Sequence, residues 1–458
     1  MTLLAKKTAK SIPLTPVDPS TLKTWAQKQD KPTQNWIKDS GFNAMPGTLL
    51  LVPGKDGTLS RVLFGARDTG GLYAYADLPA RLPEHKAGYF IDAKLDRDHA
   101  TQAALGWALG CYHFSRYKSS GKNGFAALVY PDKADKKAID AATSATFFVR
   151  DLVNLPPNVL GPDELAKAAA DMGKTFGAKT TVIRGKDLLK KNYPAIYAVG
   201  QGSPRAPALV DMRWGNPKHP RVTLVGKGVC FDTGGLNIKT GNFMALMKKD
   251  MGGAAHALGL AQMIMSHKLP VCLRVLVPAV ENAVDGASYR PSDIIDTRKG
   301  ITVEVGDTDA EGRIVLADAL TEAVSEKPAL VIDFATLTGA ARVALGPDLP
   351  ATFCNDERTA AALLTAATDT QDPLWRMPLW QPYKDMLNSK AADTNNIGGS
   401  FAGAITAALF LEKFVSAETP WVHIDTYAWN PASRPGRPEG GEALGMRACF
   451  GLIEKMFG

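Results

Sequence analysis

The sequence predicts an α/β protein in which a small N-terminal α/β domain is joined by a helix to a larger domain with a mostly parallel, helix-flanked sheet. After Pro162, short apolar runs typical of strands alternate with longer runs whose apolar residues recur at helical spacing. This alternation is typical of a parallel sheet covered by helices. At 458 residues, 45% hydrophobic and 22% charged, the chain is long enough for two or three globular domains.

The first domain is expected to span residues 1–133. One helix is predicted over 100–117, because apolar residues there follow helical spacing. The histidines of this domain, His85, His99 and His113, are too dispersed along the sequence to suggest a metal site. The strand-like runs of this domain are 48–52, 61–64, 72–75, 89–91 and 126–130.

A long helical pattern over 134–155 ends at Pro156-Pro157, where a helix is expected to stop. We therefore expect residues 134–157 to form a connecting helix and residues 158–458 to form the second domain. The helices predicted in that domain are 162–176, 244–267 and 312–325, and the strands are 195–199, 221–225, 272–277, 330–334 and 421–426.

The most informative segment is 307–313, which reads Asp-Thr-Asp-Ala-Glu-Gly-Arg between a strand-like run and a helix-like run. Three carboxylates this close would repel one another in water, but hard divalent cations bind clustered carboxylate oxygens. A solvated acidic turn that caps the following helix is the alternative, because acidic residues are favoured at a helix N-terminus. The segment alone leaves both interpretations open.

A second polar segment follows the strand-like run 221–225. It places Lys227 and Asp232 among glycines, which allow close backbone approaches, and Lys239 and Asp250 come after it. Ligands of parallel α/β sheets bind at the carboxyl ends of strands. Two lysines and two aspartates could instead form a structural salt-bridge cluster.

Together these segments resemble the active-site signatures of the leucyl aminopeptidase family, the cytosolic M17 metallopeptidases. The matching motifs keep the family's order and spacing over about residues 150–430. They are 150–158, 225–228, 231–235, 238–239, 249–254, 307–313, 335–340 and 403–408. One departure is Asp307, where the family signature usually has Asn, and it adds negative charge beside the expected metal ligands.

The resemblance implies that residues 158–458 are a catalytic dimetal peptidase domain with two divalent cations per subunit, Mn²⁺ or Zn²⁺. Two residues, Asp232 and Glu311, would bridge the cations. One cation would also be held by Lys227 and Asp250, and the other by Asp309. A water shared by two cations is a nucleophile near neutral pH.

The resemblance also implies the other roles. Lys239 would polarise the peptide carbonyl and stabilise the oxyanion, and Arg313 would bind a bicarbonate ion that carries the proton. For Arg313 a structural salt bridge is the alternative, and for Met247 it is core packing. The substrate pocket would draw on Met247, Thr336, Leu337 and Gly339. Peptides are the expected substrates, and the family assembles as a homohexamer.

Composition agrees with a cytoplasmic enzyme. The five cysteines form no CxxC pair, which favours reduced thiols. Residues 1–10 lack the apolar core of a signal peptide, and no run approaches the ~18 apolar residues of a membrane span. The net charge of +7 is mild, and the basic runs are interspersed with acids and not with aromatics, so no nucleic-acid partner is expected.

Two other functions remain open. One is a metal-dependent hydrolase of another kind, such as a specialist for Cys-Gly dipeptides. The other is a DNA-binding or regulatory protein with a vestigial site, but the retention of all five candidate metal ligands argues against a loss of catalysis.

Overall fold

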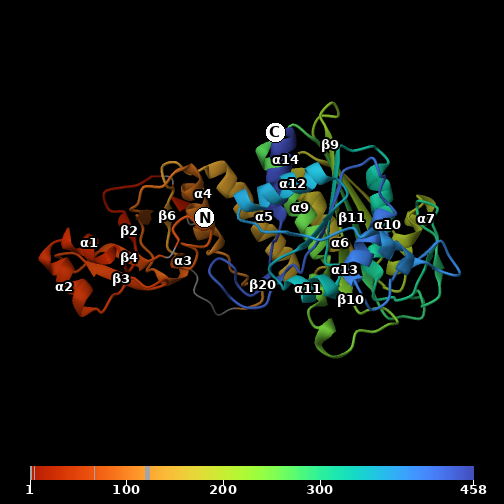
Figure 1. Ribbon diagram of the computed structural model, residues 1–458, viewed down its shortest axis with the longest axis horizontal. Coiled ribbons are helices and arrows are strands. Elements are labelled where there is room, and N and C mark those ends of the chain that lie inside the picture. The colour runs from red at the N-terminus through yellow and green to blue at the C-terminus, as the bar shows by residue number, and fades with distance from the viewer. Residues whose placement is uncertain (1–2, 5, 67, 119–123) are drawn as a thin grey trace. The chain divides into compact units, whose positions relative to one another are not determined.

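The computed structural model describes residues 3–4, 6–66, 68–118 and 124–458, and it is shown in Figure 1. The chain forms two compact units. The first contains residues 1–147 and 432–439, and the second contains 148–431 and 440–458. The boundary at residue 147 falls inside helix α5, Lys136–Asn154. The division at 133 and 157, with this helix as the connector, stays a prediction.

The first unit is built on a six-stranded sheet in the order β1-β6-β5-β2-β4-β3. All its pairings are parallel except β3 with β4. The strands are β1 Leu3–Leu4, β2 Ile12–Val17, β3 Leu49–Pro53, β4 Leu59–Gly65, β5 Tyr89–Ile91 and β6 Leu128–Val129. The helices are α1 Leu22–Gln27, α2 Lys31–Asp39, α3 Leu78–Arg81 and α4 Arg97–Leu109.

Two predictions for this unit are wrong. Residues 72–75 form turns and no strand, although Leu72 and Tyr75 are buried. They pack directly on α4, where an added Cβ at Gly106 would lie 1.7 Å from the Leu72 carbonyl oxygen. The apolar run therefore reflects burial of these residues against α4 and not the formation of a strand. The predicted helix 100–117 ends at Leu109, and its first turn is capped by Asp96, whose side chain accepts a hydrogen bond from the His99 N–H.

The second unit contains a nine-stranded sheet, and five of its eight strand pairings are parallel. Its order is β16-β15-β18-β14-β9-β11-β8-β7, with β10 also paired to β11. The strands are β7 Lys179–Arg184, β8 Ala208–Trp214, β9 Arg221–Gly226, β10 Gly228–Asp232, β11 Cys272–Asn282, β14 Leu330–Ala335, β15 Ala351–Cys354, β16 Trp375–Arg376 and β18 Trp421–Asp425.

Strand β11 is the longest of the sheet, and it holds two consecutive strands in line. Its first half, from Cys272 to Leu276, pairs with β9, and its second half, from Ala279 to Asn282, pairs with β10. The single residue between β9 and β10 is Lys227. This lysine therefore leaves the sheet at a fixed point near the carboxyl end of β9.

Helices lie on both sides of this sheet, with α9, α12 and α14 on one side and α10 and α13 on the other (Figure 1). They are α6 Pro162–Thr175, α7 Asp187–Lys190, α8 Pro194–Gly200, α9 Gly252–His267, α10 Glu311–Val324, α11 Gly339–Leu345, α12 Glu357–Asp369, α13 Gly403–Glu412 and α14 Met446–Phe457. The remaining elements are the 3₁₀ helices η1 Gly241–Met244, η2 Met247–Met251 and η3 Gln381–Leu387, and the short strands β12 Ile294–Ile295, β13 Val303–Glu304, β17 Thr394–Asn395, β19 Trp429–Asn430 and β20 Gly440–Gly441.

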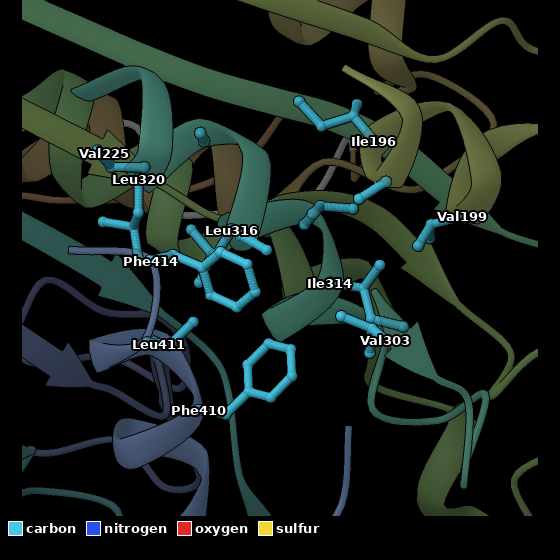
Figure 2. Packing of buried hydrophobic residues seen from close by; sticks show 14 of the residues in the cluster. Ile196, Val199, Val225, Val303, Ile314, Leu316, Leu320, Phe410, Leu411 and Phe414 are labelled. Carbon is cyan, nitrogen blue, oxygen red and sulfur yellow. The ribbon is translucent and has the colours of Figure 1, made fainter. Parts of the chain in front are cut away.

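The main core of the second unit lies between α10, α13 and the sheet. Figure 2 shows Phe410 of α13 and Phe414, which follows that helix, directed toward Leu316 and Ile314 of α10, and all four side chains are fully buried. Fully burying side chains of this size contributes about 1.5–3 kcal/mol each. The core therefore fixes the position of α10, whose first residue is Glu311.

Two predictions for this unit also need correction. Residues 195–199 form helix α8, which Pro194 begins and whose Ala195 and Ile196 N–H groups donate to the Asp318 carboxylate. A five-residue apolar run does not distinguish a buried strand from a buried helix. The helix predicted over 244–267 begins as an α-helix only at Gly252, after two 3₁₀ turns. None of the helices in the described part of the chain is long and apolar enough to cross a membrane.

Candidate functional site

A cavity of about 460 Å³ lies at the carboxyl ends of the neighbouring strands β9, β14 and β18. This end of a parallel sheet is where α/β proteins bind ligands. The lining residues come from four stretches of the second unit, within 227–250, 307–311, 336–350 and 425–427. Both sequence segments that pointed to metal chemistry therefore reach the same cavity.

Lys227 enters the site from the break between β9 and β10. An added Cβ at Gly226 would lie 2.6 Å from the Ala254 Cα, so glycine is needed for α9 to approach the strand end this closely. An added Cβ at Gly312 would lie 2.7 Å from the Lys227 Nζ. The first turn of α10 therefore leaves the space that the lysine side chain occupies.

The buried Lys227 ammonium lies between two carboxylates. Its Nζ is 2.8 Å from Asp250 Oδ2 and 2.7 Å from Glu311 Oε1, and it donates to the Thr336 carbonyl oxygen at 2.9 Å. Asp250 lies on η2, and Thr336 follows β14. One side chain thus links four segments of the unit.

Lys239 lies on the loop that follows β10 and pairs with two other carboxylates. Its Nζ is 2.8 Å from Asp232 Oδ2 and also donates to Asp309 Oδ1. The loop turns back through Gly234 and Gly235, which have φ angles of +88° and +64°. Only glycine adopts this region readily. The Lys239 side chain is 13% exposed, against 3% for Lys227, so Lys239 is the more accessible of the two.

Several buried polar residues hold these loops together. Asn282, the last residue of β11, donates to Asp232 Oδ1 at 2.8 Å and to the Thr308 carbonyl oxygen at 3.0 Å. The Thr308 hydroxyl accepts from the Asn237 N–H at 2.8 Å, and the Tyr289 hydroxyl donates to the Thr308 carbonyl oxygen at 2.6 Å. The two acidic segments are therefore fixed to each other by groups that leave the acids free to face the cavity.

The cluster carries an excess of negative charge. Four carboxylates (Asp232, Asp250, Asp309 and Glu311) surround two lysine ammonium groups, which leaves a formal charge of −2 when all are ionised. Burial and the Asp232 charge raise the pKa of Glu311 well above its usual value. The same two causes raise the pKa of Asp309 to about 7. A carboxylate cluster with this repulsion is stabilised by a bound cation.

The pKa values of the two lysines are raised as well, which favours their charged forms. Burial opposes the charged form of Lys227, but the charges of Asp250 and Glu311 outweigh it and raise its pKa. Burial likewise opposes the charge of Lys239, and Asp232 and Glu311 outweigh that effect. These pKa shifts are the ones that the side chains impose on one another. A divalent cation bound between them acts in the opposite direction on the lysines, because it disfavours their charged form and lowers their pKa.

The donor set fits divalent cations. One ligand oxygen from each of Asp232, Asp309 and Glu311 lies within 4.8 Å of the other two. Asp250 Oδ2 and Glu311 Oε1 are buried and accept no well-oriented hydrogen bond from any described residue, although both lie within ion-pair distance of Lys227. Buried carboxylate oxygens are ordinarily satisfied, and oxygen donors of this kind suit hard or borderline cations.

The residues predicted to contact substrate lie on the cavity wall. Met247, Thr336, Leu337 and Gly339 all line it, and Met247 is partly exposed there. Asp307 lines it too, and its Oδ1 accepts a hydrogen bond from the Asp309 N–H at 2.8 Å. An asparagine side-chain oxygen could accept the same bond, so the extra charge at this position is not needed for the local turn.

Arg313 differs from the other predicted residues. It does not line the cavity, and its Nη1 donates to the Asn396 carbonyl oxygen at 2.5 Å. The side chain has no acidic partner among the described residues, so the alternative of a structural salt bridge is not what the structure shows. Its Nε–H is buried and donates to no acceptor within the described part of the chain.

Sequence reasoning missed several residues of the cavity. The structure adds Asn282 beneath the acids, and Lys249, Arg342, Asp425 and Tyr427 along the wall. Position after a predicted strand is the signal that could have identified Asp425 and Tyr427, because β18 ends there. Nothing in the sequence brings Lys249 and Arg342 together, since their proximity depends on how η2 and α11 are placed.

Comparison with protein families gives two matches that together cover most of the chain. The catalytic domain of the cytosol aminopeptidase family matches residues 147–450. The N-terminal domain of M17 aminopeptidases matches residues 12–131.

Individual relatives agree with the family matches. A probable cytosol aminopeptidase of Chlorobium luteolum is 41% identical, over 83% of this chain and 79% of that protein. One from Xanthobacter autotrophicus is 42% identical, over 92% and 87%. Among solved structures, the cytosol aminopeptidase of Coxiella burnetii superposes with a TM-score of 0.96 at 49% identity and covers 100% of this chain and 99% of that one. The bottromycin maturation enzyme BotP in complex with Mn superposes with a TM-score of 0.88 at 30% identity, covering 98% and 100%.

The geometry predicts how the cluster responds to loss of one charge. Glu311→Gln keeps the size of the side chain and removes a carboxylate that faces three other acids and a lysine. We expect the affinity for Mn²⁺ or Zn²⁺ to fall by more than the ~10–100-fold that loss of an outer-shell partner costs. Calorimetric titration and elemental analysis measure this, with the exposed Glu418→Gln as a control. Unchanged affinity and stoichiometry in Glu311→Gln would contradict the cation site.

Proposed function

The chain belongs to the cytosol aminopeptidase family, a family of metalloexopeptidases, and on that premise we propose that it releases N-terminal residues, leucine-type residues among them, from peptides bound in the cavity at the ends of β9, β14 and β18. The observation that carries the proposal is the convergence of four carboxylates and two lysines on that cavity.

We assign two cations to the cluster. Lys227, Asp232, Asp250 and Glu311 would hold one, and Asp232, Asp309 and Glu311 would hold the other, so that Asp232 and Glu311 bridge. When bound, two such cations lower the pKa of a water molecule and polarise the scissile carbonyl. The oxygen-rich donor set is compatible with Mn²⁺ or Zn²⁺. The Mn in the related BotP complex supports Mn²⁺.

Lys239 is proposed as the group that stabilises developing negative charge on the substrate oxygen. Its ammonium is the more exposed of the two site lysines, and it lies on a loop whose ends are fixed by hydrogen bonds to the Thr308 region. A preorganised donor aimed at an oxyanion does not need to reorganise during the reaction. Lys227 is enclosed by Asp250, Glu311 and Thr336 and cannot take the same role.

Arg313 is proposed to bind a bicarbonate ion that accepts and returns the proton, in place of a side-chain base. Two features support this assignment: the buried Nε without a partner among the described residues, and the position two residues after Glu311. Because Arg313 does not line the cavity as the side chains stand, the ion would have to approach from the Asn396 side of the cluster.

The cavity also explains why the free N-terminus of a peptide would be selected. A free, neutral α-amine would ligate one of the cations assigned to Asp232, Asp250 and Asp309, whereas an internal peptide bond offers no such group. Met247, Thr336, Leu337 and Gly339 line the same cavity and would contact the first side chain. A cavity of about 460 Å³ accommodates a short peptide end.

Assembly and location belong to the same proposal. We propose a homohexamer that acts in the cytosol, and Val343 and Phe401, each 81% exposed, are consistent with subunit contacts. Light scattering is the measurement. A stable species at the 48.9 kDa of one chain, at micromolar concentration, would exclude the hexamer.

Alanine substitutions of Lys239 and Lys227 should differ in their effects on cation content and on kcat. Lys239→Ala should keep both cations and lower kcat by ~10²–10³, the usual loss when one oxyanion donor is removed. Lys227→Ala should instead lower the cation content. Elemental analysis and steady-state kinetics on leucine p-nitroanilide, measured on both variants, test this. Equal loss of metal in the two variants would show that the roles are wrongly divided.

Blocking the N-terminus should abolish cleavage. Leu-Gly-Gly should be hydrolysed by the metal-loaded enzyme at its first peptide bond, and N-acetyl-Leu-Gly-Gly should be inert, because an acetylated nitrogen cannot ligate a cation as a free amine would. Mass spectrometry of the products is the readout. Comparable cleavage of both peptides, or cleavage at internal bonds of a longer peptide, would exclude an aminopeptidase.

A further inference from the structure

Two positively charged side chains on the cavity wall have no acidic partner. Within the described part of the chain, neither the Lys249 Nζ nor the Arg342 guanidinium has a hydrogen-bond acceptor or lies in an ion pair. Both approach the ring of Tyr427, with Lys249 Nζ at 4.9 Å and the Arg342 guanidinium carbon at 5.1 Å from the ring centroid. All three residues line the cavity.

This arrangement differs from that of two other buried cations, Lys227 and Arg274. Lys249 is only 5% exposed, yet no described carboxylate lies within ion-pair distance of its ammonium, which contacts the Tyr427 ring and is attracted by Asp250 and Asp425 only at longer range. By contrast, Lys227 faces two carboxylates, and Arg274 faces Asp211 and Glu322. Buried charges are ordinarily paired, and a cation–π contact contributes only about 0.5–2 kcal/mol. An anion that enters the cavity would supply the missing partner.

The nearby acids do not fill this role. Asp425 lines the same wall, but its carboxylate already accepts hydrogen bonds from the Leu337 N–H, the Thr338 N–H and the Thr338 hydroxyl. Asp250 is engaged by Thr336 and Lys227. With two cations and the single Asp425 carboxylate, this part of the wall keeps a formal charge of +1, opposite in sign to the metal cluster.

The position of Lys249 indicates which part of a peptide would meet it. Lys249 follows Met247 by two residues on η2 and precedes Asp250, so it lies between a residue proposed to contact the first side chain and a proposed metal ligand. Arg342 is on α11, three residues after Gly339. Both cations therefore border the space assigned to the first side chain of the substrate.

We propose that Lys249 and Arg342, which both approach the Tyr427 ring on the cavity wall, form an anion-binding subsite that selects peptides whose N-terminal residue is glutamate or aspartate. The inference rests on the proposed aminopeptidase function and specifies its substrate class. An arginine fork and a lysine ammonium are the usual partners of a carboxylate. A lysine or arginine at the peptide N-terminus would be repelled.

The test compares Glu-Gly-Gly-amide with Gln-Gly-Gly-amide, which differ in one charge and carry no C-terminal carboxylate. A charged hydrogen bond predicts that kcat/KM is about 10–100-fold higher for the glutamyl peptide. Lys249→Met should bring this ratio close to one, and the half-buried Arg342→Gln should lower it. Lys248→Met is the matched control, because Lys248 is on the same 3₁₀ helix but donates to the Asn154 carbonyl oxygen outside the cavity lining.

Two further measurements make the outcome decisive. The ratio is formed from two peptides measured on the same variant, so a general loss of activity in Lys249→Met cancels and a changed ratio reports selectivity, while Leu-Gly-Gly-amide serves as an uncharged reference peptide. A wild-type ratio near one, or an unchanged ratio in both cavity variants, overturns the proposal while leaving the aminopeptidase function intact. If Lys249→Met instead alters the preference for Leu-Gly over Leu-Gly-amide, the bound carboxylate is the C-terminal one, and the N-terminal assignment is wrong.

Binding provides a readout that does not depend on turnover. Calorimetry on the metal-loaded protein should show L-glutamate bound about 10–100-fold more tightly than L-glutamine, with the difference lost in Lys249→Met. If no peptide is cleaved by the wild-type protein, the proposed function fails. The glutamate–glutamine difference then still decides whether the subsite exists, and equal affinities would overturn it.

Discussion

The site depends on how one long strand aligns two short ones. Because β11 pairs with β9 and then with β10, the chain crosses from one to the other at Lys227, whose N–H donates to the Phe334 carbonyl oxygen of β14 and whose carbonyl oxygen accepts from the Ala254 N–H of α9. Both backbone groups are thus occupied by neighbouring elements. The buried ammonium then requires carboxylates, and η2 and the first turn of α10 supply them.

The cavity has two electrostatic regions on one scaffold. At the ends of β10 and α10 the acids outnumber the lysines, and burial raises the pKa of Glu311 and Asp309. Along η2 and α11 the cations outnumber the available acids. Asp425, the last residue of β18, lines the same cavity and is held by backbone and hydroxyl donors. A ligand with an amine at one end and a carboxylate nearby would match both regions at once.

Sequence patterns were sufficient to predict a strand or helix where the element's own residues determine its secondary structure. The strands 221–225, 330–334 and 421–426 and the helices 162–176 and 312–325 were predicted within about two residues, because each has a clear apolar period and a clear end. The acidic motif and the lysine–glycine segment identified the four carboxylates and two lysines that meet in the cavity. The family and the α/β class were confirmed by the comparisons.

The errors have a common physical origin, since they lie where tertiary contacts decide. Residues 72–75 and 195–199 are apolar because they are buried, but the packing on Gly106 and the capping by Asp318 make them a turn and a helix. The contacts around Tyr427 join residues from three separate elements. The apolar periodicity of a single segment does not predict such a contact.

The acids of the cluster come from segments far apart in the sequence, so only the folded chain gathers them. A cation bound to this cluster finds no equivalent set of ligands in the unfolded chain, and binding is therefore linked thermodynamically to folding. When the free cation exceeds its dissociation constant a hundredfold, the free energy of unfolding rises by about 2.7 kcal/mol. A cation site formed by Asp232, Asp309 and Glu311, as proposed, would thus make the resistance of the second unit to unfolding depend on the supply of metal in its surroundings.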